Sequence, residues 1–360
     1  MSSSTTTRAI SIADRAAGRT TEDSGSRRAA RPRHTPRIGF AGVGWIGRAR
    51  LDALADTGLV EVAAVADPDQ EARMEAAAQT PGVARVGAFE ELLAEDLDGL
   101  VIATPSALHA EQATTALERG VAVFCQKPLG RTAAETRQVV EAARRRDLPL
   151  GVDFCYRHVR AAEAVRDQIA AGALGEVYAA DLTFHNAYGP DKAWFYDLER
   201  AGGGCLIDLG IHLVDLARWT LGFPAVEGTT ARLYAGGRPW RGEGAEDYAE
   251  ARLDLAGGVS ARIACSWNLP ADRDAIIEAT FYGTEAAARM RNVDGSFYDF
   301  VAERLEDGHA VTLAEPPDDW GGRAIAAWAA ALADGESFDP AVAEAVAVAE
   351  TLDRIYGRAP

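Results

Sequence analysis

A lysine, an aspartate and a histidine are the residues of this sequence whose types and spacing best suit proton transfer. Lys127 stands in segment 125–130, Cys-Gln-Lys-Pro-Leu-Gly, directly after an apolar run in which a strand would end. Asp208 and His212 lie four residues apart, and therefore share one face if their segment is helical. Histidine titrates near neutral pH, and an ammonium group stabilises an oxygen that gains negative charge. The three side chains together are suited to an alcohol–ketone interconversion in which another group carries the hydride.

The carrier of that hydride is predicted from a glycine-rich turn nearer the start of the chain. A short apolar strand precedes Gly42, Gly44 and Gly47, which have the spacing G-x-G-x-x-G. A helical run and a second apolar strand follow, and Asp67 stands at the end of that strand, 20 residues after Gly47. This order of strand, glycine turn, helix, strand and acid is the fingerprint of a dinucleotide-binding fold. The alternative is a tight strand-to-helix turn that binds no ligand.

The glycines of this turn have separate physical roles. Gly42 permits the tight turn, Gly44 lets the backbone approach a pyrophosphate, and Gly47 lets the helix lie close to the strand. The N–H groups at the start of the helix, including those of Trp45 and Ile46, then face the phosphates.

Asp67 indicates which dinucleotide is bound. Its carboxylate accepts hydrogen bonds from a ribose 2′-hydroxyl and repels a 2′-phosphate, so the sequence favours NAD. Arg73, a short distance into the next helix, softens this preference, and NADP is the alternative.

Strands and helices alternate up to about residue 154, which predicts a doubly wound parallel sheet. We expect its strands at 37–41, 60–66, 99–103, 121–124 and 149–154, and its helices at 48–57, 70–79, 89–94, 107–119 and 133–146. Ligands of such sheets lie beyond the carboxyl ends of the strands. Thr104 and Pro105 follow one strand, and Gln126, Lys127 and Pro128 follow another, so both segments are expected to line the cofactor cleft. The alternative role of these prolines is simply to end the strands.

The second half of the chain has a different pattern, with strand following strand. It predicts an α+β domain with a largely antiparallel sheet. We expect strands at 176–185, 228–235, 248–255, 259–267 and 275–282, and helices at 161–171, 320–334 and 340–356. The expected organisation is a disordered tail at 1–36, a dinucleotide-binding domain at 37–155 and an α+β domain at 156–360, whose last helix is able to pack back on the first domain.

The composition limits which binding partners and which cellular compartment are expected for this protein. The net charge is −17, and seven arginines against three acids in residues 1–36 leave −21 on the remainder, which argues against nucleic acid. The absence of a long apolar run or a secretory signal argues against a membrane segment. The four cysteines have no C-x-x-C spacing and the six histidines form no ligand cluster, so we expect no metal and a cytoplasmic protein with reduced thiols.

Five motifs occur in an order that resembles the Gfo/Idh/MocA family of sugar and inositol oxidoreductases, from residue 37 to the last helix. They are the glycine loop 42–47; Thr104-Pro105 with His109 as T-P-x-x-x-H; Gln126-Lys127-Pro128 in place of E-K-P; Tyr156-Arg157; and Gly203-Gly204 with Asp208 and His212 as G-G-x-x-x-D-x-x-x-H. The resemblance implies a Rossmann domain followed by an open-faced sheet domain that carries the substrate site and often makes an oligomer interface.

The resemblance also implies roles for single residues. Lys127 would contact the reacting oxygen, His212 would be the general base or acid, and Asp208 would bind substrate or tune the other two. Gln126 replaces the family's usual glutamate, and its amide is still able to hydrogen-bond the nicotinamide ribose. The implied sites and partners are as follows: cofactor contacts from Gly42, Gly44, Trp45, Ile46, Gly47, Asp67, Thr104, Pro105, His109, Gln126 and Lys127; substrate contacts from Lys127, Tyr156, Arg157, Tyr188, Asp208 and His212; a small polyhydroxylated substrate, namely a sugar, cyclitol or aminosugar; and a homodimer or homotetramer.

Other interpretations stay open at this point. A redox-neutral enzyme of the same fold with tightly bound NAD, or a non-catalytic dinucleotide sensor, would share these motifs. Asp208 and His212 would be a surface helix pair in the simplest interpretation, and Asp215 has either a structural salt bridge or a site role. Asp153 and the acidic loop containing Glu246 either attract an amine-bearing sugar or are merely solvated.

Overall fold

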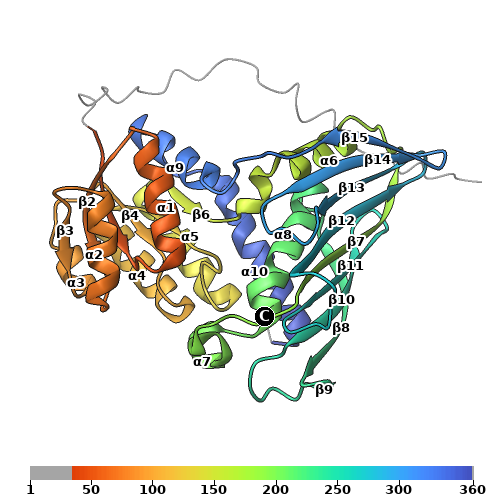
Figure 1. The fold of residues 1–360 in the computed structure, drawn as a ribbon, viewed down its shortest axis with the longest axis horizontal. Helices are drawn as coiled ribbons and strands as arrows, with labels where there is room; N and C mark the ends of the chain where they lie inside the picture. Colours follow the sequence, from red (N-terminus) through yellow and green to blue (C-terminus); the bar gives the residue numbers. More distant parts are fainter. Residues whose placement is uncertain (1–34, 359–360) are drawn as a thin grey trace, which may run out of the picture. The chain divides into compact units, whose positions relative to one another are not determined.

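Two β-sheets form the core of the protein, which we describe from a computed structural model covering residues 35–358. Figure 1 shows the sheets and the helices that cover them. The predicted disordered tail lies outside the described residues except for Thr35 and Pro36.

The first sheet has six parallel strands in the order β3-β2-β1-β4-β5-β6. This is the strand order of a dinucleotide-binding fold, so the predicted doubly wound parallel sheet is confirmed. Its central strands consist of buried apolar residues because helices cover both faces. The strands are β1 (Arg37–Ala41), β2 (Glu61–Ala66), β3 (Ala84–Val86), β4 (Gly99–Ile102), β5 (Ala122–Cys125) and β6 (Leu150–Val152).

The helices between these strands differ from the predicted ones mainly at their ends. The first begins at residue 45 rather than 48, since Gly44 already serves as its N-cap in an extended conformation. The short strand β3 was not predicted. The helices are α1 (Trp45–Asp56), α2 (Gln70–Gln79), α3 (Phe89–Leu92), α4 (Ser106–Glu118) and α5 (Ala133–Arg146).

The second sheet has nine strands in the order β15-β14-β13-β12-β7-β11-β10-β8-β9. Its pairs are antiparallel except β7 with β11, which is parallel. In β10 buried residues alternate with more exposed ones, as expected for a sheet covered on one face. The strands are β7 (Val177–Asn186), β8 (Val226–Ala235), β9 (Arg238–Pro239), β10 (Tyr248–Leu255), β11 (Val259–Ser266), β12 (Ala275–Gly283), β13 (Ala287–Asn292), β14 (Phe300–Glu306) and β15 (His309–Ala314).

Helices cover one face of this sheet (Figure 1). Helix α6 lies against β13, β14 and β15, and α8 lies against β7, β11 and β12. The remaining helical elements are η2 (Cys155–His158), α6 (Arg160–Ala170), η3 (Ala193–Tyr196), α7 (Leu198–Ala201), η4 (Leu206–Gly210), α8 (Ile211–Thr220), α9 (Arg323–Ala333), η5 (Pro340–Ala343) and α10 (Glu344–Tyr356). The predicted helix at 320–334 begins three residues later, and the one at 340–356 opens with the 3-10 turn η5.

The last two helices both contact the first sheet or its helices. Helix α9 lies against α1, β5 and β6, where the ring of Trp328 is 5.9 Å from that of Phe124. A Cβ atom on Gly99 or Gly151 would come within 2.8 or 3.1 Å of the Trp328 ring, so both glycines make room for it. Helix α10 packs between α5 and α8. The C-terminal helices thus link the first sheet and its helices to α8, which covers the second sheet.

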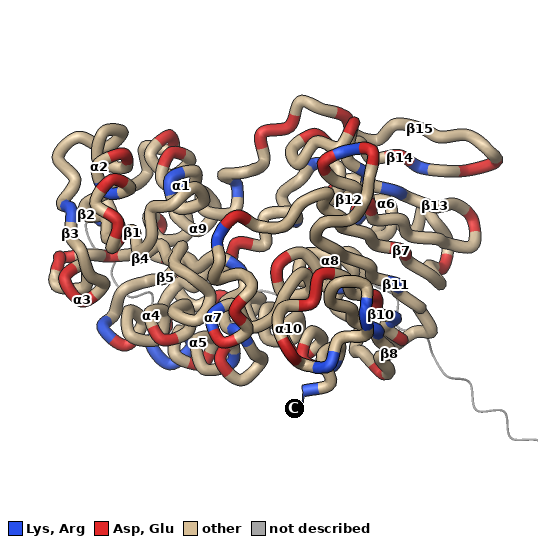
Figure 2. Tube along the Cα trace, turned by 60° about the horizontal axis from the view of Figure 1, so that its bottom comes forward, with Lys and Arg blue, Asp and Glu red and all other residues tan. Residues whose placement is uncertain are grey.

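The charges are distributed over both parts of the structure. Figure 2 shows Asp and Glu on helices of the parallel sheet and on loops of the second sheet. Within residues 35–358, no helix combines the length and the apolar character needed to cross a lipid bilayer.

Candidate active site

A cleft of about 2300 Å³ lies at the carboxyl ends of β1, β4 and β5 and is bordered by residues of the second half of the chain. Most of the residues predicted for the site line it. These are Gly42, Gly44, Trp45, Ile46, Asp67, Thr104, Pro105, His109, Gln126, Lys127, Tyr156, Tyr188, Asp208 and His212. Gly47 and Arg157 are not among the lining residues.

The glycine turn has the shape that a pyrophosphate requires. Gly42 has φ of +86°, and a Cβ atom there would lie 2.6 Å from the carbonyl oxygen of Ala103. A Cβ atom on Gly47 would lie 2.2 Å from the carbonyl oxygen of Gly42, so only a glycine lets α1 pack this closely beneath the turn. A Cβ atom on Gly44 would meet nothing within 4 Å. The backbone at Gly44 therefore borders open space at the uncapped start of α1, as dinucleotide binding demands.

Asp67 is held at the edge of this turn. Its Oδ2 accepts a hydrogen bond from the backbone N–H of Val43 and its Oδ1 one from that of Asp69, both at 2.9 Å. Arg73 donates to the backbone carbonyl of Asp67 but does not line the cleft. The carboxylate thus faces the cleft with a fixed orientation, where a ribose 2′-hydroxyl would find an acceptor.

His109 ties together the two loops that border the cleft. Its Nδ1 lies 2.7 Å from the carbonyl oxygen of Pro128 and its Nε2 lies 2.7 Å from that of Thr104. The Thr104 hydroxyl in turn donates to Oε1 of Gln112 at 2.7 Å. The buried imidazole therefore fixes the distance between the ends of β4 and β5.

Lys127 and Asp208 form an ion pair across the cleft. The Lys127 ammonium donates to Oδ1 and to the backbone carbonyl oxygen of Asp208, each at 2.7 Å. The other carboxylate oxygen, Oδ2, accepts from the indole N–H of Trp267 at 3.1 Å. Both oxygens of Asp208 are thus engaged by protein groups, so the carboxylate holds the Lys127 ammonium in place.

His212 lies one turn further along the same helical run. Asp208 lies in the π-helical turn η4, which runs directly into α8, where His212 lies. The side chains of Asp208 and His212 both line the cleft. Burial, and then the charges of Lys127 and Arg50, lower the pKa of His212 well below its ordinary value. The imidazole is therefore neutral at neutral pH, and its Nδ1 has no hydrogen-bond partner among the described residues. Tyr156 lies edge-on to it with 4.9 Å between ring centroids.

The glycine-rich segment before η4 is clamped by a buried carboxylate. Glu246 is fully buried and accepts hydrogen bonds from the N–H groups of Gly204 and Leu206 and from the hydroxyl of Tyr356. A Cβ atom on Gly204 would lie 2.0 Å from the Glu246 carbonyl oxygen, and one on Gly203 would lie 2.1 Å from the Tyr356 hydroxyl oxygen. Glu246 therefore fixes the segment that leads to Asp208, and it does not belong to a solvated acidic loop.

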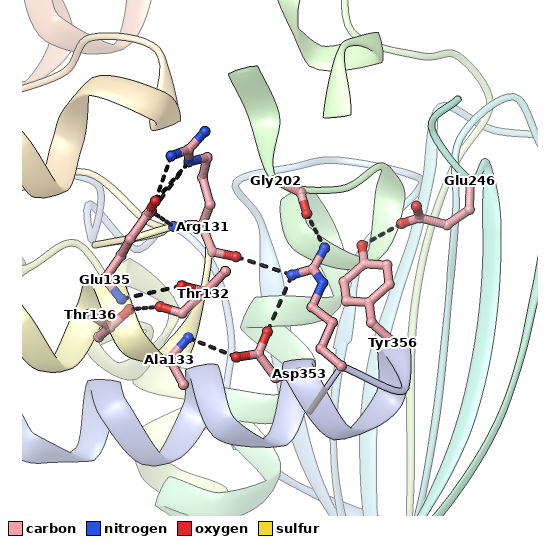
Figure 3. A network of polar contacts seen from close by, with 10 residues as sticks. Arg131, Thr132, Ala133, Glu135, Thr136, Gly202, Glu246, Asp353 and Tyr356 are labelled. Atoms are coloured by element: carbon pink, nitrogen blue, oxygen red, sulfur yellow. Dashed lines mark hydrogen bonds and ion pairs between the residues drawn. The ribbon is translucent and has the colours of Figure 1, made fainter. Parts of the chain in front are cut away.

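The end of α10 extends this clamp to the loop after Lys127. Figure 3 shows Glu246 and Tyr356 beside the contacts of Asp353. Arg358 donates to the carbonyl oxygens of Arg131 and Gly202 and to Asp353, whose Oδ2 accepts from the N–H of Ala133. One helix end thus holds the segments that carry Lys127 and Asp208.

Arg157 has a structural position in this arrangement. Its guanidinium forms a forked ion pair with Asp215 and a second ion pair with Glu344 at 2.6 Å. Of the two roles considered for Asp215, the structure therefore supports the salt bridge.

Sequence reasoning missed Arg50 and Trp267, and it considered Asp153 only as a group that attracts an amine-bearing sugar or is solvated. Arg50 and Asp153 form a buried ion pair at 2.6 Å, and both line the cleft. Trp267 was not singled out, although its indole holds Asp208. These partners are far apart in the chain and come from different elements, so no local pattern indicates them. Groups of three or more His, Cys, Asp or Glu that could hold a metal ion do not occur within residues 35–358.

Comparisons with known proteins agree with this geometry. Residues 36–154 match the model of the oxidoreductase family with an NAD-binding Rossmann fold, and residues 162–289 match the Gfo/Idh/MocA C-terminal domain. The chain is 30% identical to the rhizopine catabolism protein MocA of Rhizobium meliloti, over 75% of this chain and 84% of that protein. It belongs to the Gfo/Idh/MocA family of oxidoreductases.

Two further relatives cover nearly the whole of this family member. A D-xylose 1-dehydrogenase (NADP(+)) of Haloferax volcanii is 32% identical over 89% of this chain and 96% of its own. The crystal structure of GenD2 from gentamicin A biosynthesis, in complex with NAD, is 25% identical with a TM-score of 0.75, and the match covers 93% of this chain and 97% of GenD2. The predicted enzyme class and nicotinamide dinucleotide cofactor of this Gfo/Idh/MocA protein are confirmed.

Proposed function

We propose that this protein interconverts a secondary alcohol and a ketone on the ring of a sugar, cyclitol or aminosugar. The observation that carries the proposal is the ion pair between Lys127 and Asp208, which lies in the same cleft as His212 and the dinucleotide turn. A positive group and a neutral base are thereby available in the cleft that would bind the cofactor.

The cofactor would be held by residues that already line the cleft. The backbone at Gly42 and Gly44 would take the pyrophosphate, Asp67 the adenosine ribose, and Gln126 the nicotinamide ribose. When bound, the nicotinamide accepts or donates the hydride.

Lys127 and His212 would divide the remaining chemistry. The Lys127 ammonium, oriented by Asp208, would donate a hydrogen bond to the reacting oxygen and stabilise its negative charge. The neutral imidazole of His212 would take the hydroxyl proton during alcohol oxidation and return it during ketone reduction. Burial of His212 keeps water away from this proton transfer.

The aromatic residues of the cleft support a ring-shaped polyhydroxylated substrate. Tyr156, Tyr188, Trp194 and Trp320 line the cleft, and such side chains combine a flat apolar face with a polar edge. Relatives of this chain include a D-glucoside 3-dehydrogenase of Escherichia coli and a putative UDP-kanosamine synthase oxidoreductase subunit of Amycolatopsis mediterranei. Their names support a sugar or aminosugar as the substrate class.

We also propose a homodimer or homotetramer in the cytoplasm. The face of the nine-stranded sheet opposite α6 and α8 carries half-buried residues such as Thr183 and Ala264 on central strands. A second copy of the chain would cover this face. Chromatography with light scattering tests the assembly.

The first experiment is to follow NADH absorbance with purified protein, NAD or NADP, and a panel of neutral sugars, inositols and aminosugars. Reduction of NAD with one ring class supports the proposal. NADH binding without turnover of any ring would overturn it in favour of a sensor, and turnover of a ring without net NADH change would favour a redox-neutral enzyme.

A further inference from the structure

Gln126 occupies the position at which the related motif has a glutamate, and its side chain is fixed by a buried ion pair. The amide nitrogen Nε2 donates to Oδ2 of Asp153 at 2.5 Å. The same oxygen accepts from Nε of Arg50 at 2.6 Å. Asp153 is 1% exposed, and Gln126 and Arg50 are 7% exposed, so this contact is almost free of solvent.

These contacts fix which end of the amide faces which partner. A carboxylate oxygen only accepts hydrogen bonds, so the donor Nε2 must face Asp153. The carbonyl oxygen Oε1 lies on the other side of the planar amide and is left as an acceptor in the cleft, which Gln126 lines. An amide held in this way presents the same kind of atom as a glutamate carboxylate.

The three residues also come from three separate segments of the first half of the chain. Arg50 lies on α1, Gln126 follows β5, and Asp153 follows β6. The N–H of Asp153 donates to the carbonyl oxygen of Cys125 at 2.9 Å, and that of Gln126 to the carbonyl oxygen of Ile102 at 2.9 Å. The backbone thus places both side chains beside each other, and their contact does not depend on a flexible loop.

We propose that Arg50 and Asp153 are positioning residues that orient Gln126 as an acceptor for the nicotinamide ribose, so that the carboxylate of the related motif is moved from position 126 to position 153. This inference rests on the proposed binding of the cofactor in the cleft. It predicts that position 126 no longer tolerates glutamate, because a glutamate side chain there and Asp153 would be two carboxylates in contact in a buried site. It also predicts that exchanging both residues restores binding.

The test is a titration of purified protein with NADH and with ADP, which lacks the nicotinamide ribose. Gln126→Glu is expected to weaken NADH binding by about tenfold or more, since a like-charged buried pair is strongly unfavourable. The double variant Gln126→Glu/Asp153→Asn, which keeps the net charge of the natural chain, is expected to regain most of that loss. ADP binding is expected to stay unchanged in both variants.

Two further variants make the outcome decisive. Gln126→Ala removes the acceptor, leaves the Arg50–Asp153 ion pair in place, and is expected to weaken NADH but not ADP binding. Asp215→Asn breaks the buried ion pair with Arg157 outside the cleft, and is expected to lower the melting temperature without changing either affinity. This control separates a loss of stability from a loss of orientation.

The proposal is overturned if Gln126→Glu binds NADH as tightly as the natural chain. It is also overturned if the double variant is no better than the single one while Gln126→Ala binds NADH normally, or if NADH and ADP affinities fall together. A natural chain that binds neither ligand would instead refute the proposed function itself.

Discussion

The Lys127 ammonium donates to both the Oδ1 atom and the carbonyl oxygen of Asp208, each at 2.7 Å. Lys127 follows β5, and Asp208 lies in η4 of the second half of the chain. The positive group of the site is therefore held by a residue from the other side of the cleft, and its position depends on how the two parts pack.

Replacement of Lys127 tests this arrangement directly. Lys127→Met is expected to lower kcat by roughly 100- to 1000-fold, because a donor aimed at a developing oxyanion contributes on that order. The chain has only one other lysine, Lys192, which borders the same cleft but is largely exposed and pairs with Asp191, so Lys192→Met is a matched control that should lose far less activity than Lys127→Met. Steady-state kinetics of both variants test this role. Equal losses of kcat would refute the assignment of Lys127 as the donor to the reacting oxygen.

The lowered pKa of His212 sets the expected pH dependence. Its folded-state pKa lies well below the ordinary value of 6.5, so the imidazole stays a neutral base as the pH falls through that value. The kcat/KM for alcohol oxidation should therefore remain constant through about pH 6.5 and fall only in more acidic buffer. Ketone reduction needs the protonated form and should accelerate toward acid.

A matched variant isolates this effect from other titrating groups. His212→Gln cannot transfer a proton and is expected to lower kcat by roughly 10²- to 10⁴-fold and to flatten the acidic limb of the profile. A limb that survives unchanged in His212→Gln would assign the titration to another residue.

Two glycines of the dinucleotide turn are expected to respond in opposite ways to the same substitution. A Cβ atom on Gly44 meets no atom within 4 Å, and its φ of −64° suits alanine, so Gly44→Ala should fold normally but weaken NADH binding. A Cβ atom on Gly47 would lie 2.2 Å from the Gly42 carbonyl oxygen. Gly47→Ala should therefore lose about 1–3 kcal/mol of stability, as overpacked sites do. Thermal melts and NADH titrations of both variants separate the two effects.

Much of this architecture is predictable from the sequence where the signal is local. The strand 37–41, the helices 70–79 and 133–146 and the strand 248–255 have the predicted bounds, because apolar periodicity and capping residues define them. The hairpin of β14 and β15 was missed, and β15 is largely exposed, so its residues carry little of the apolar signal that marks a half-buried strand.

The chemistry of the site is predictable only in part. Lys127, Asp208 and His212 were singled out by type and spacing, but the indole that holds Asp208 lies 59 residues away in the sequence. Arg50 and Asp153 are 103 residues apart, and only packing brings them together. Arg157 was predicted to bind substrate, yet the structure pairs it with Asp215 and Glu344 outside the lining of the cleft.

Asp67 is expected to set the preference for NAD over NADP. Asp67→Asn removes the charge that repels a 2′-phosphate, so the ratio of kcat/KM values for the two cofactors should shift toward NADP by at least about tenfold, or ~1.4 kcal/mol. Asp69→Asn, two residues away, is the control, because Asp69 also borders the cleft but its side chain caps α2, so this variant should shift the ratio far less than Asp67→Asn. A natural chain that prefers NADP would contradict the role given to Asp67.

The hydroxyl of Tyr356 links the end of α10 to the segment that carries Asp208. Tyr356→Phe removes one of the donors to the buried carboxylate of Glu246 and should cost about 1–3 kcal/mol in the free energy of unfolding. Gly203→Ala should also be destabilising, since its Cβ atom would lie 2.1 Å from that hydroxyl oxygen.

The two substitutions are expected to be coupled, because the hydroxyl that crowds position 203 is the group that Tyr356→Phe removes. In a double-mutant cycle, Gly203→Ala should cost less in the Tyr356→Phe background than in the natural chain, with a coupling energy of roughly 0.5–3 kcal/mol. Denaturant unfolding of the four proteins measures this energy. Additive losses of unfolding free energy would mean that Gly203 and Tyr356 are not in contact in solution. The end of α10 would then not stabilise the segment that carries Asp208.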